Sequence, residues 1–430
     1  MNIKSLIDDH PMTGLQYSVV VVCFLMNMLD GMDVLIMSYT APAIAKAWGT
    51  GPEALGAVFS SGLLGMTIGT LFISPLADRI GRKKMMLISA LIMGVCIYLT
   101  SYATSVNHLL IFRFVSGLGI GSMLATTAAL IAEYSPHKTK DFWVSAAIAG
   151  YPTGAVVSGL VAAKVIPLDG WAQMFKYAGY ASITAVPVVL IFLYESIDYY
   201  LKGQPDHALG KINQILNKMG HTSLSALPEL PPKQAAIPLD KLLHTEYKQD
   251  TMQLWAALFM AFATLYFLTS WIPKLASNAG LPLHLAIYAG TVFNIGAFFG
   301  IMCQGYLSTK FGLKKTLGYI FIFTSVLMVS FSFFAGSGLL LLIFGLLGFG
   351  IQGGFVGLYA AAARMYPTAF RATGVGWAMG AGRLGGIVGP ALGGILIGAG
   401  LSMTANFLVF AVPALFAGLI TMRMKSKEVS

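Results

Sequence analysis

The sequence predicts an all-α polytopic membrane protein whose twelve transmembrane helices form two six-helix repeats. Hydrophobic residues make up 57% of the 430 residues and charged residues only 10%, against about 45–50% and about 25% in soluble globular domains. Twelve apolar runs each approach the length of about 20 residues that crosses a bilayer as a helix. The second half of the chain also repeats landmarks of the first half at one constant offset. An ordinary soluble protein is thereby excluded.

The twelve apolar runs are bounded by polar or turn-forming residues. They cover 16–41, 54–77, 83–103, 109–132, 142–164, 173–195, 252–275, 284–307, 315–336, 338–362, 372–397 and 403–422. The connections between them are short except for one. We therefore expect an N-terminal six-helix bundle over 1–195, a cytoplasmic linker over 196–251 and a C-terminal six-helix bundle over 252–430.

The long linker contains one segment with helical periodicity. Between Asp206 and Met219, apolar residues recur at helical spacing while Lys211 and Lys218 point elsewhere. This pattern predicts an amphipathic helix on the cytoplasmic face. The Pro-rich segment Pro228–Pro238 that follows is typical of extended linker.

The basic residues indicate the orientation of the chain. The connections after the odd-numbered spans hold only Lys46, Lys164, Lys176 and Lys274, and the other basic residues outside the spans lie in the tails, the linker and the even-numbered connections. By the positive-inside rule both termini are cytoplasmic, and the absence of a glycosylation sequon suits an inner (plasma) membrane. The net charge of +10 is thus a topology signal, and no nucleic-acid partner is expected.

The three cysteines lie in apolar stretches without a nearby histidine cluster. No metal site, disulfide or cofactor is predicted. No nucleotide-binding loop, HExxH or GxSxG motif is present, so an enzyme is not expected.

An offset of 231 residues relates the two halves. It pairs Pro42 with Pro273 and Lys84 with Lys315, and it continues through Lys83 and Lys314, Pro136 and Pro367 and several glycines. Two parallel six-span repeats are a recurring transporter design, in which the substrate site lies between the halves near the bilayer midplane. The repeat therefore predicts transport by alternating access.

The run Asp-Arg-Ile-Gly-Arg-Lys at 78–83 resembles the cytoplasmic loop signature of the major facilitator superfamily. The resemblance implies the major facilitator fold and a gating role for the matching residues and their repeat counterparts, which are Asp78, Arg79, Gly81, Arg82, Lys310 and Gly312. Thr309 stands where the repeat would carry an acid.

Only four ionisable residues lie well inside the predicted spans: Asp30, Asp33, Arg113 and Arg383. Such residues cost about 2.5–3.5 kcal/mol each in the membrane and are functional candidates. Asp30 and Asp33 share one helix face because they are three residues apart. From the outer ends of their spans, Asp33 lies about 10 Å deep and Arg113 about 7 Å, so we expect these two to pair. The alternative is a structural pair that only fixes helix packing.

A proton-coupled carrier needs a carboxyl group whose proton uptake depends on conformation. The aspartate pair beside an arginine meets this need, and Glu133, at the inner end of the fourth span, is a second candidate. For Glu133 the alternative is a charge pair with Arg364 or Lys140.

Arg383 has no acid near it in sequence, and its planar guanidinium suits a substrate carboxylate. Other polar and aromatic residues are placed to line a central cavity, where an aromatic substrate would stack on rings. They are Asn27, Tyr39, Tyr151, Tyr266, Trp271, Asn294, Gln304, Gln352, Tyr359 and Trp377. Gln352 ranks high because it replaces the counterpart of Gly121 inside a helix.

The run Leu-Asp-Gly-Met-Asp-Val at 29–34 resembles the aromatic acid:proton symporter family within that superfamily. The resemblance implies uptake of benzoate-like or hydroxybenzoate-like anions with protons, with Asp30 and Asp33 in coupling and Arg113 and Arg383 in anion handling. A proton-driven exporter of apolar or cationic compounds is the alternative, and a non-transporting receptor on the same fold is a third. The expected partners are a small organic anion, protons and the lipid bilayer, with the protein acting as a monomer.

Overall fold

The structure is a computed structural model. It describes residues 7–8, 10–228, 248–278, 280–333, 339–366 and 371–424. Within these ranges the regular structure is helical throughout, and twelve helices are long and apolar enough to cross a membrane. The prediction of an all-α chain with twelve spans is confirmed.

The first half has six spans. They are α2 (Gly14–Trp48), α3 (Pro52–Ile68), α5 (Arg82–Thr100), α6 (Val106–Tyr134), α7 with α8 (Lys140–Ile148 and Gly150–Asp169) and α9 (Trp171–Phe192). The second span continues beyond α3 through short elements, and the fifth consists of two consecutive helices. The short elements are η1 (Gly69–Ile73), η2 (Ser74–Leu76) and α4 (Ala77–Ile80).

The last six spans follow two short helices of the linker, α10 (Ile197–Gly203) and α11 (Ala208–Lys218). They are α13 (Lys248–Asn278), α14 (Leu283–Phe311), α15 (Leu313–Ser330) with η3 (Phe331–Phe333) after it, α16 (Leu340–Met365), α17 (Arg371–Gly398) and α18 (Met403–Arg423). Several helices extend beyond the predicted runs. In particular, α2 continues through Pro42 to Trp48, although its apolar run was expected to end at 41.

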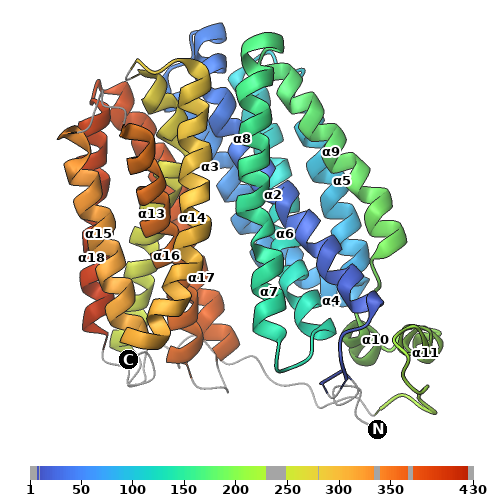
Figure 1. Ribbon diagram of the computed structural model, residues 1–430. Coiled ribbons are helices and arrows are strands. Elements are labelled where there is room, and N and C mark those ends of the chain that lie inside the picture. The colour runs from blue at the N-terminus through green and yellow to red at the C-terminus, as the bar shows by residue number, and fades with distance from the viewer. Residues whose placement is uncertain are drawn as a thin grey trace.

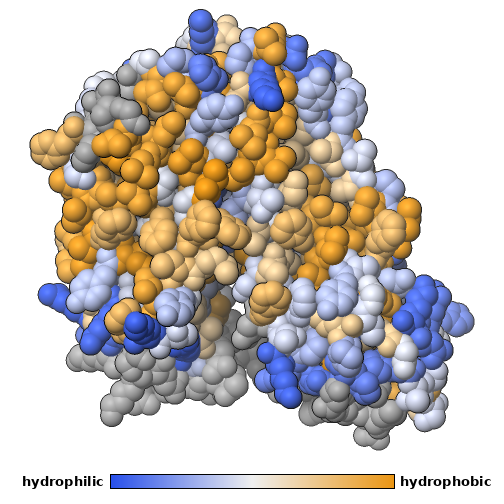
Figure 2. All heavy atoms as spheres, in the orientation of Figure 1, coloured by the Kyte–Doolittle hydropathy of each residue, from blue (hydrophilic) through white to orange (hydrophobic). Residues whose placement is uncertain are grey.

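The helices of the two halves lie in two groups, with α2 to α9 on the right of Figure 1 and α13 to α18 on the left. The start of α2, the end of α18, α10 and α11 lie at the lower end of the molecule, which we call the linker end; the other is the opposite end. An apolar surface covers the middle of the molecule in Figure 2, with hydrophilic residues gathered toward the two ends. The division of the chain at residues 195 and 251 stays a prediction.

Glycines allow close helix packing at repeated positions in both halves. A Cβ atom on Gly65 of α3 would collide with the backbone carbonyl of Phe114 in α6, and one on its counterpart Gly296 of α14 would collide with that of Gly345 in α16. Small residues permit such backbone approach between membrane helices. The same two contacts therefore hold α3 to α6 and α14 to α16.

The linker helix α11 confirms the predicted amphipathic helix. Its apolar residues Ile212, Ile215 and Leu216 are buried, whereas Lys211 and Lys218 are exposed. Helix α10 was not predicted. Of the Pro-rich segment Pro228–Pro238, only Pro228 lies among the described residues.

Candidate functional site

A buried ion pair joins α2 and α6. The Arg113 guanidinium donates from Nη1 to Asp33 Oδ1 at 2.5 Å and from Nη2 to the Asp33 backbone oxygen at 3.1 Å. Ser116 Oγ lies 3.4 Å from the second carboxylate oxygen. The exposed fraction is 0% for Asp33 and 5% for Arg113. The predicted pairing is present, with geometry that satisfies both charges in an apolar interior.

Asp30 lies one helical turn from Asp33 and is less well satisfied. It is 1% exposed, and no hydrogen-bond partner is found for its Oδ1 among the described residues. The charge of Asp30 interacts electrostatically with those of Asp33, Arg113 and Arg383. The structure therefore gathers the four intramembrane charges that the sequence singled out.

Arg383 differs from the other three charges. It is only partly buried, and no hydrogen bond or ion pair joins its guanidinium to any residue that the structure describes. Arg383 lies on α17, which packs against α13. The rings of Phe262 and Tyr266 in α13 lie against Gly382 and Gly386 in α17. An available guanidinium beside aromatic rings can bind a carboxylate that is attached to an aromatic group.

Tyrosines surround the charged cluster. Tyr266 lies within electrostatic range of Arg383, Tyr359 and Asp30, and Tyr151 within range of Asp30 and Tyr266. The Tyr266 ring stacks on Phe262 with centroids 5.9 Å apart. Two predicted site residues, Tyr151 and Tyr359, are thus near the charges. Tyr266, named only among wider candidates, is there too.

Three other predicted residues have no interaction with the charged cluster among the contacts found in the described structure. Trp377 is 48% exposed and stacks on Trp255 at 6.3 Å, six residues nearer the linker end of α17 than Arg383. Gln352 is partly buried in α16. Asn294 is buried and donates to the Gly290 carbonyl at 2.9 Å. Their roles in substrate binding stay predictions.

Side chains close the opposite end between the two halves. Ser38 of α2 donates to the carbonyl oxygens of Thr269 and Ser270 in α13 at 2.8 and 2.9 Å. Ser60 of α3 donates to the Ile387 carbonyl of α17 at 2.7 Å. These hydrogen bonds tie helices of the first half to helices of the second.

Two large aromatic residues belong to the same closure. Tyr39 is fully buried, donates to the Ala155 carbonyl at 3.0 Å and contacts Thr291 and Asn294 of α14. Trp271 is also fully buried; its Nε1 donates to the Pro390 carbonyl at 3.0 Å, and its ring meets Phe59 edge-on at 5.2 Å. We call the closure formed by Ser38, Tyr39, Ser60 and Trp271 the seal.

At the linker end, no side-chain hydrogen bond between the halves is found in the part of the chain that the structure describes. Among the described residues, every side-chain hydrogen bond between the two halves lies in the seal. Figure 2 shows the surface hollowed between the halves at the linker end. The charged cluster lies next to the seal, since Asp33 precedes Ser38 by five residues and Arg383 precedes Ile387 by four. Arg383 is thus partly exposed and lies one helical turn from Ile387, whose carbonyl accepts the Ser60 hydrogen bond of the seal.

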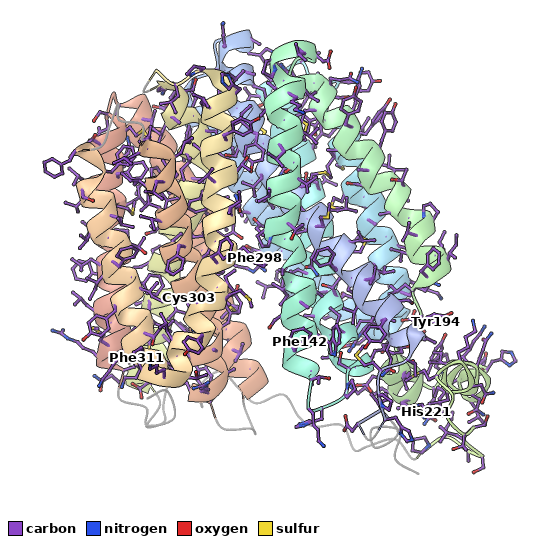
Figure 3. All side chains as sticks on the ribbon, in the orientation of Figure 1. Phe142, Tyr194, His221, Phe298, Cys303 and Phe311 are labelled. Atoms are coloured by element: carbon purple, nitrogen blue, oxygen red, sulfur yellow. The ribbon has the colours of Figure 1, made fainter. Side chains whose placement is uncertain are left out.

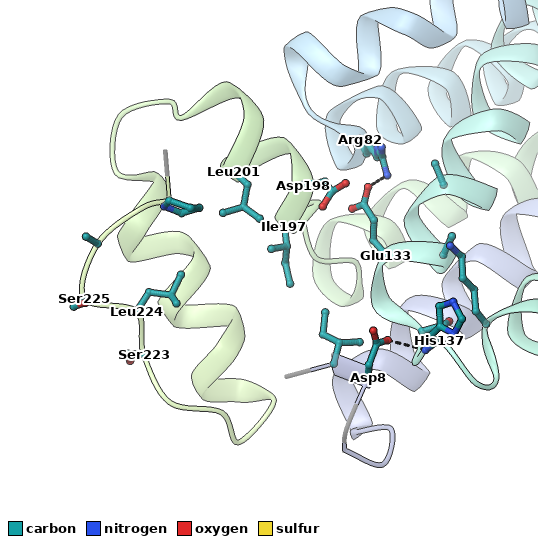
Figure 4. A pocket seen from close by; sticks show the side chains of 17 residues that line it. Asp8, Arg82, Glu133, His137, Ile197, Asp198, Leu201, Ser223, Leu224 and Ser225 are labelled. Carbon is teal, nitrogen blue, oxygen red and sulfur yellow. Dashed lines mark hydrogen bonds and ion pairs between the residues drawn. The ribbon is translucent and has the colours of Figure 1, made fainter. Parts of the chain in front are cut away.

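A second charged cluster lies at the linker end of the first half (Figure 4). Arg82 forms an ion pair with Glu133, and Ser196 Oγ donates to the other Glu133 oxygen at 2.5 Å. Arg82 and Glu133 border a cavity of 980 Å³. The partner of Glu133 is thus Arg82 and not Arg364 or Lys140, so the charge pair suggested for it was wrong. Asp78 is 3.5 Å from Arg82 and its side chain is 71% exposed.

Glu195 completes this cluster and was missed from the sequence. Its Oε1 accepts a hydrogen bond from the backbone N–H of Lys83 at 2.9 Å, at the start of α5. Gly81 has φ of 103°, which favours glycine, and a Cβ there would strike the Glu195 carboxylate. The only signal in the sequence was an acid directly at the end of a predicted span.

The gating residues of the second half are arranged differently. Gly312 also has a positive φ, of 84°. Lys310 is exposed, and its Nζ lies 5.5 Å from the centre of the Phe311 ring. Its counterpart in the first half, Arg79, is exposed as well. The turn is therefore repeated, whereas no carboxylate cap is found at the second turn among the described residues.

Comparison with known proteins agrees with the fold. The family model described as Major Facilitator Superfamily matches residues 23–304 and 254–429. The 4-hydroxybenzoate transporter PcaK of Pseudomonas aeruginosa is 31% identical over 423 residues, which cover 97% of this chain and 94% of the relative. The benzoate transport protein of Acinetobacter baylyi is 30% identical over 434 residues, with 98% and 92% covered.

Solved structures share the architecture. The inward-open structure of the xylose transporter XylE from E. coli matches with a TM-score of 0.74 at 16% identity, covering 96% of this chain and 98% of that one. At this sequence identity, the match supports a shared fold and no more. Since the family model and the relatives span nearly its whole length, the chain belongs to the Major Facilitator Superfamily and is a multi-pass membrane transporter.

Proposed function

We propose that the protein is a proton-coupled symporter that imports aromatic carboxylates, such as benzoate or hydroxybenzoates, by alternating access. The observation that carries this proposal is the charged cluster: two adjacent buried aspartates, one of them held by Arg113, beside an arginine for which the described structure holds no anionic partner. The names of the relatives, which are transporters of 4-hydroxybenzoate and benzoate, support the same substrate class.

Arg383 is the proposed anchor of the substrate carboxylate. A guanidinium forms two parallel hydrogen bonds with a carboxylate, and these charge-assisted bonds fix its orientation. Tyr266 and Tyr359 lie near this group and offer ring faces and hydroxyl groups to a substituted benzene ring. A cationic substrate would be repelled by Arg383, which argues against the export of cations.

The aspartates are the proposed proton carriers. An unpaired carboxylate is costly in a dry interior, whereas its neutral form is not. Asp30 has an oxygen without a hydrogen-bond partner in the described structure, and Asp33 shares its charge with Arg113. A proton on this pair would weaken its attraction for Arg113 and Arg383, so that Arg383 could hold a substrate anion and α2 could move relative to α6.

The basic residues support a cytoplasmic linker end and an inner (plasma) membrane location. In that orientation the seal faces the outside, and the structure corresponds to the state that releases proton and substrate into the cytoplasm. Loading from outside requires the seal to open and the linker end to close. These are the two states that alternating access needs.

The test is uptake of radiolabelled 4-hydroxybenzoate and benzoate into liposomes that contain the purified protein, with and without an inward proton gradient. We expect accumulation above equilibrium only with the gradient. Empty liposomes and the exposed-acid variant Asp206→Asn serve as controls. Equal uptake with and without the gradient would contradict proton coupling, and gradient-driven expulsion of preloaded substrate would indicate an exporter.

A further inference from the structure

An apolar groove lies on the outer surface of the second half, near the linker end. It has a volume of 600 Å³ and is formed by α14, α15 and α16. Its lining residues are Leu307, Phe311, Lys315, Thr316, Tyr319, Ile320, Phe323 and Phe349. Phe311, which Figure 3 labels at the linker end of α14, is exposed, as are Tyr319 and Phe323. On a membrane-spanning helix, such exposed rings face the lipid.

Two polar groups stand at the end of this groove nearest the linker end. Lys315 is exposed and has no ion-pair partner among the described residues. Thr316 is only 5% exposed, and no hydrogen-bond partner is found in the described structure for its buried Oγ1. A hydroxyl group buried without a partner is costly, and this one lines the groove. It therefore points to a ligand with a polar group at this position.

The same position is the first turn of α15, which begins at Leu313. The first N–H groups of a helix have no acceptor within the helix and carry a partial positive charge, so they attract anions. Lys315 adds a full positive charge at the same place. The combination of cation, hydroxyl and helix N-terminus suits a phosphate group.

The internal repeat supplies an independent comparison. In the first half, the N–H of Lys83 at the start of α5 donates to the Glu195 carboxylate. For the matching N–H at the start of α15, no carboxylate acceptor is found in the described structure, and the residue 231 positions after Glu195 is Ser426, which carries no charge. The counterpart of Thr316 is Met85, which cannot bind an anion. The first repeat thus supplies its own anion at this turn, whereas the second has no acid at the matching sequence position.

We propose that the groove binds an anionic phospholipid of the leaflet at the linker end. The lipid phosphate lies against Lys315, the Thr316 hydroxyl and the N-terminus of α15. One acyl chain runs along Tyr319, Phe323 and Phe349. Lys315 and Phe323 are eight residues apart, about 12 Å along the helix, which leads from the headgroup level into the hydrocarbon. Free inorganic phosphate would leave the aromatic part of the groove empty, which favours a lipid.

The test is native mass spectrometry of the full-length protein in detergent, titrated with palmitoyl-oleoyl phosphatidylglycerol or with the matching phosphatidylcholine. We expect a saturable adduct of one phosphatidylglycerol with higher affinity than for phosphatidylcholine. Lys315→Ala and Thr316→Val should each lower that affinity about fivefold, as expected for one surface cation or one hydrogen bond. The matched control is Lys84→Ala, which removes the repeat counterpart of Lys315 and should leave the affinity unchanged.

Four outcomes would overturn the proposal. Equal losses in Lys315→Ala and Lys84→Ala would mean unspecific attraction to basic residues. Equal affinity for the two lipids would remove the role of headgroup charge. Displacement of the adduct by millimolar inorganic phosphate would indicate a phosphate site without the lipid chain. Stronger lipid binding after deletion of residues 425–430 would identify the chain's own tail as the occupant.

Discussion

Ser38 in α2 donates its hydroxyl hydrogen to the carbonyl oxygen of Thr269 in α13. Thr269 is the residue that corresponds to Ser38 in the second repeat. The reason for this bond lies four residues further on. Pro273 lies inside α13 and has no N–H, so the Thr269 carbonyl loses its donor within the helix. The Ser38 hydroxyl supplies that donor from the other half. The seal is therefore attached to a backbone group that the proline makes available.

Ser38→Ala should weaken the seal. The buried Thr269 carbonyl would lose its donor, at a cost of about 1–3 kcal/mol, and the equilibrium would shift toward opening at the opposite end. Hydrogen–deuterium exchange should rise in the segments 38–48 and 264–278. Ser18→Ala, which removes a hydroxyl bonded to Phe192 within the first half, is the control. Equal exchange in wild type and Ser38→Ala would mean that the hydroxyl does not hold the seal.

Asp33→Asn should abolish proton-driven accumulation of substrate while leaving exchange of substrate across the membrane. It should also lower stability by about 3–5 kcal/mol, because Arg113 remains as a buried unpaired charge. The double variant Asp33→Asn with Arg113→Gln should recover thermal stability without recovering accumulation. If the double variant recovers both, the pair is structural and the coupling role is lost.

Arg383→Ala should weaken binding of 4-hydroxybenzoate about tenfold to a hundredfold, which corresponds to the loss of a hydrogen bond to a charged group. Arg383→Lys keeps the charge but loses the paired geometry, so we expect an intermediate loss. Binding is measured by calorimetry on the purified protein. Arg364→Ala, an exposed arginine at the linker end, is the control. Unchanged affinity in Arg383→Ala would place the carboxylate elsewhere.

Glu133→Gln should destabilise the linker end of the first half. The carboxylate accepts hydrogen bonds from both Arg82 and Ser196, and its side chain is mostly buried. The variant should therefore lower the free energy of unfolding by about 1–3 kcal/mol. Asp78→Asn should change stability by less than about 1 kcal/mol, since its contact with Arg82 is exposed. Thermal unfolding measures both. If Glu133→Gln instead lowers the accumulation ratio at unchanged stability, Glu133 belongs to the proton path.

The charged cluster could be predicted because charges are rare within membrane spans. Four ionisable residues in an apolar sequence must find one another, and the depths of Asp33 and Arg113 matched. Glu195 could not be predicted in the same way, since acids are common at span ends and its bond to Lys83 depends on how α9 leads into the linker.

The closure of the opposite end was also beyond the sequence. Tyr39 and Trp271 were named among the residues that could line a central cavity, with a membrane-interface anchor as the alternative for Trp271 near its span end. The structure buries both between the halves, because which faces of α2 and α13 meet depends on the conformational state, and hydrophobic pattern does not encode that state.

The glycine contacts divide the molecule into places that tolerate substitution and places that do not. Within each half, even the methyl group of alanine at Gly65 or Gly296 would meet a neighbouring backbone, which cannot swing aside as a side chain can. Between the halves, hydroxyl groups and rings meet at the seal, and Gly56 of α3 also lies against the backbone of Pro390 and Gly394 in α17. A saturation library selected for transport should therefore show its strictest positions at glycines that never touch the substrate, both within each half and where α3 meets α17.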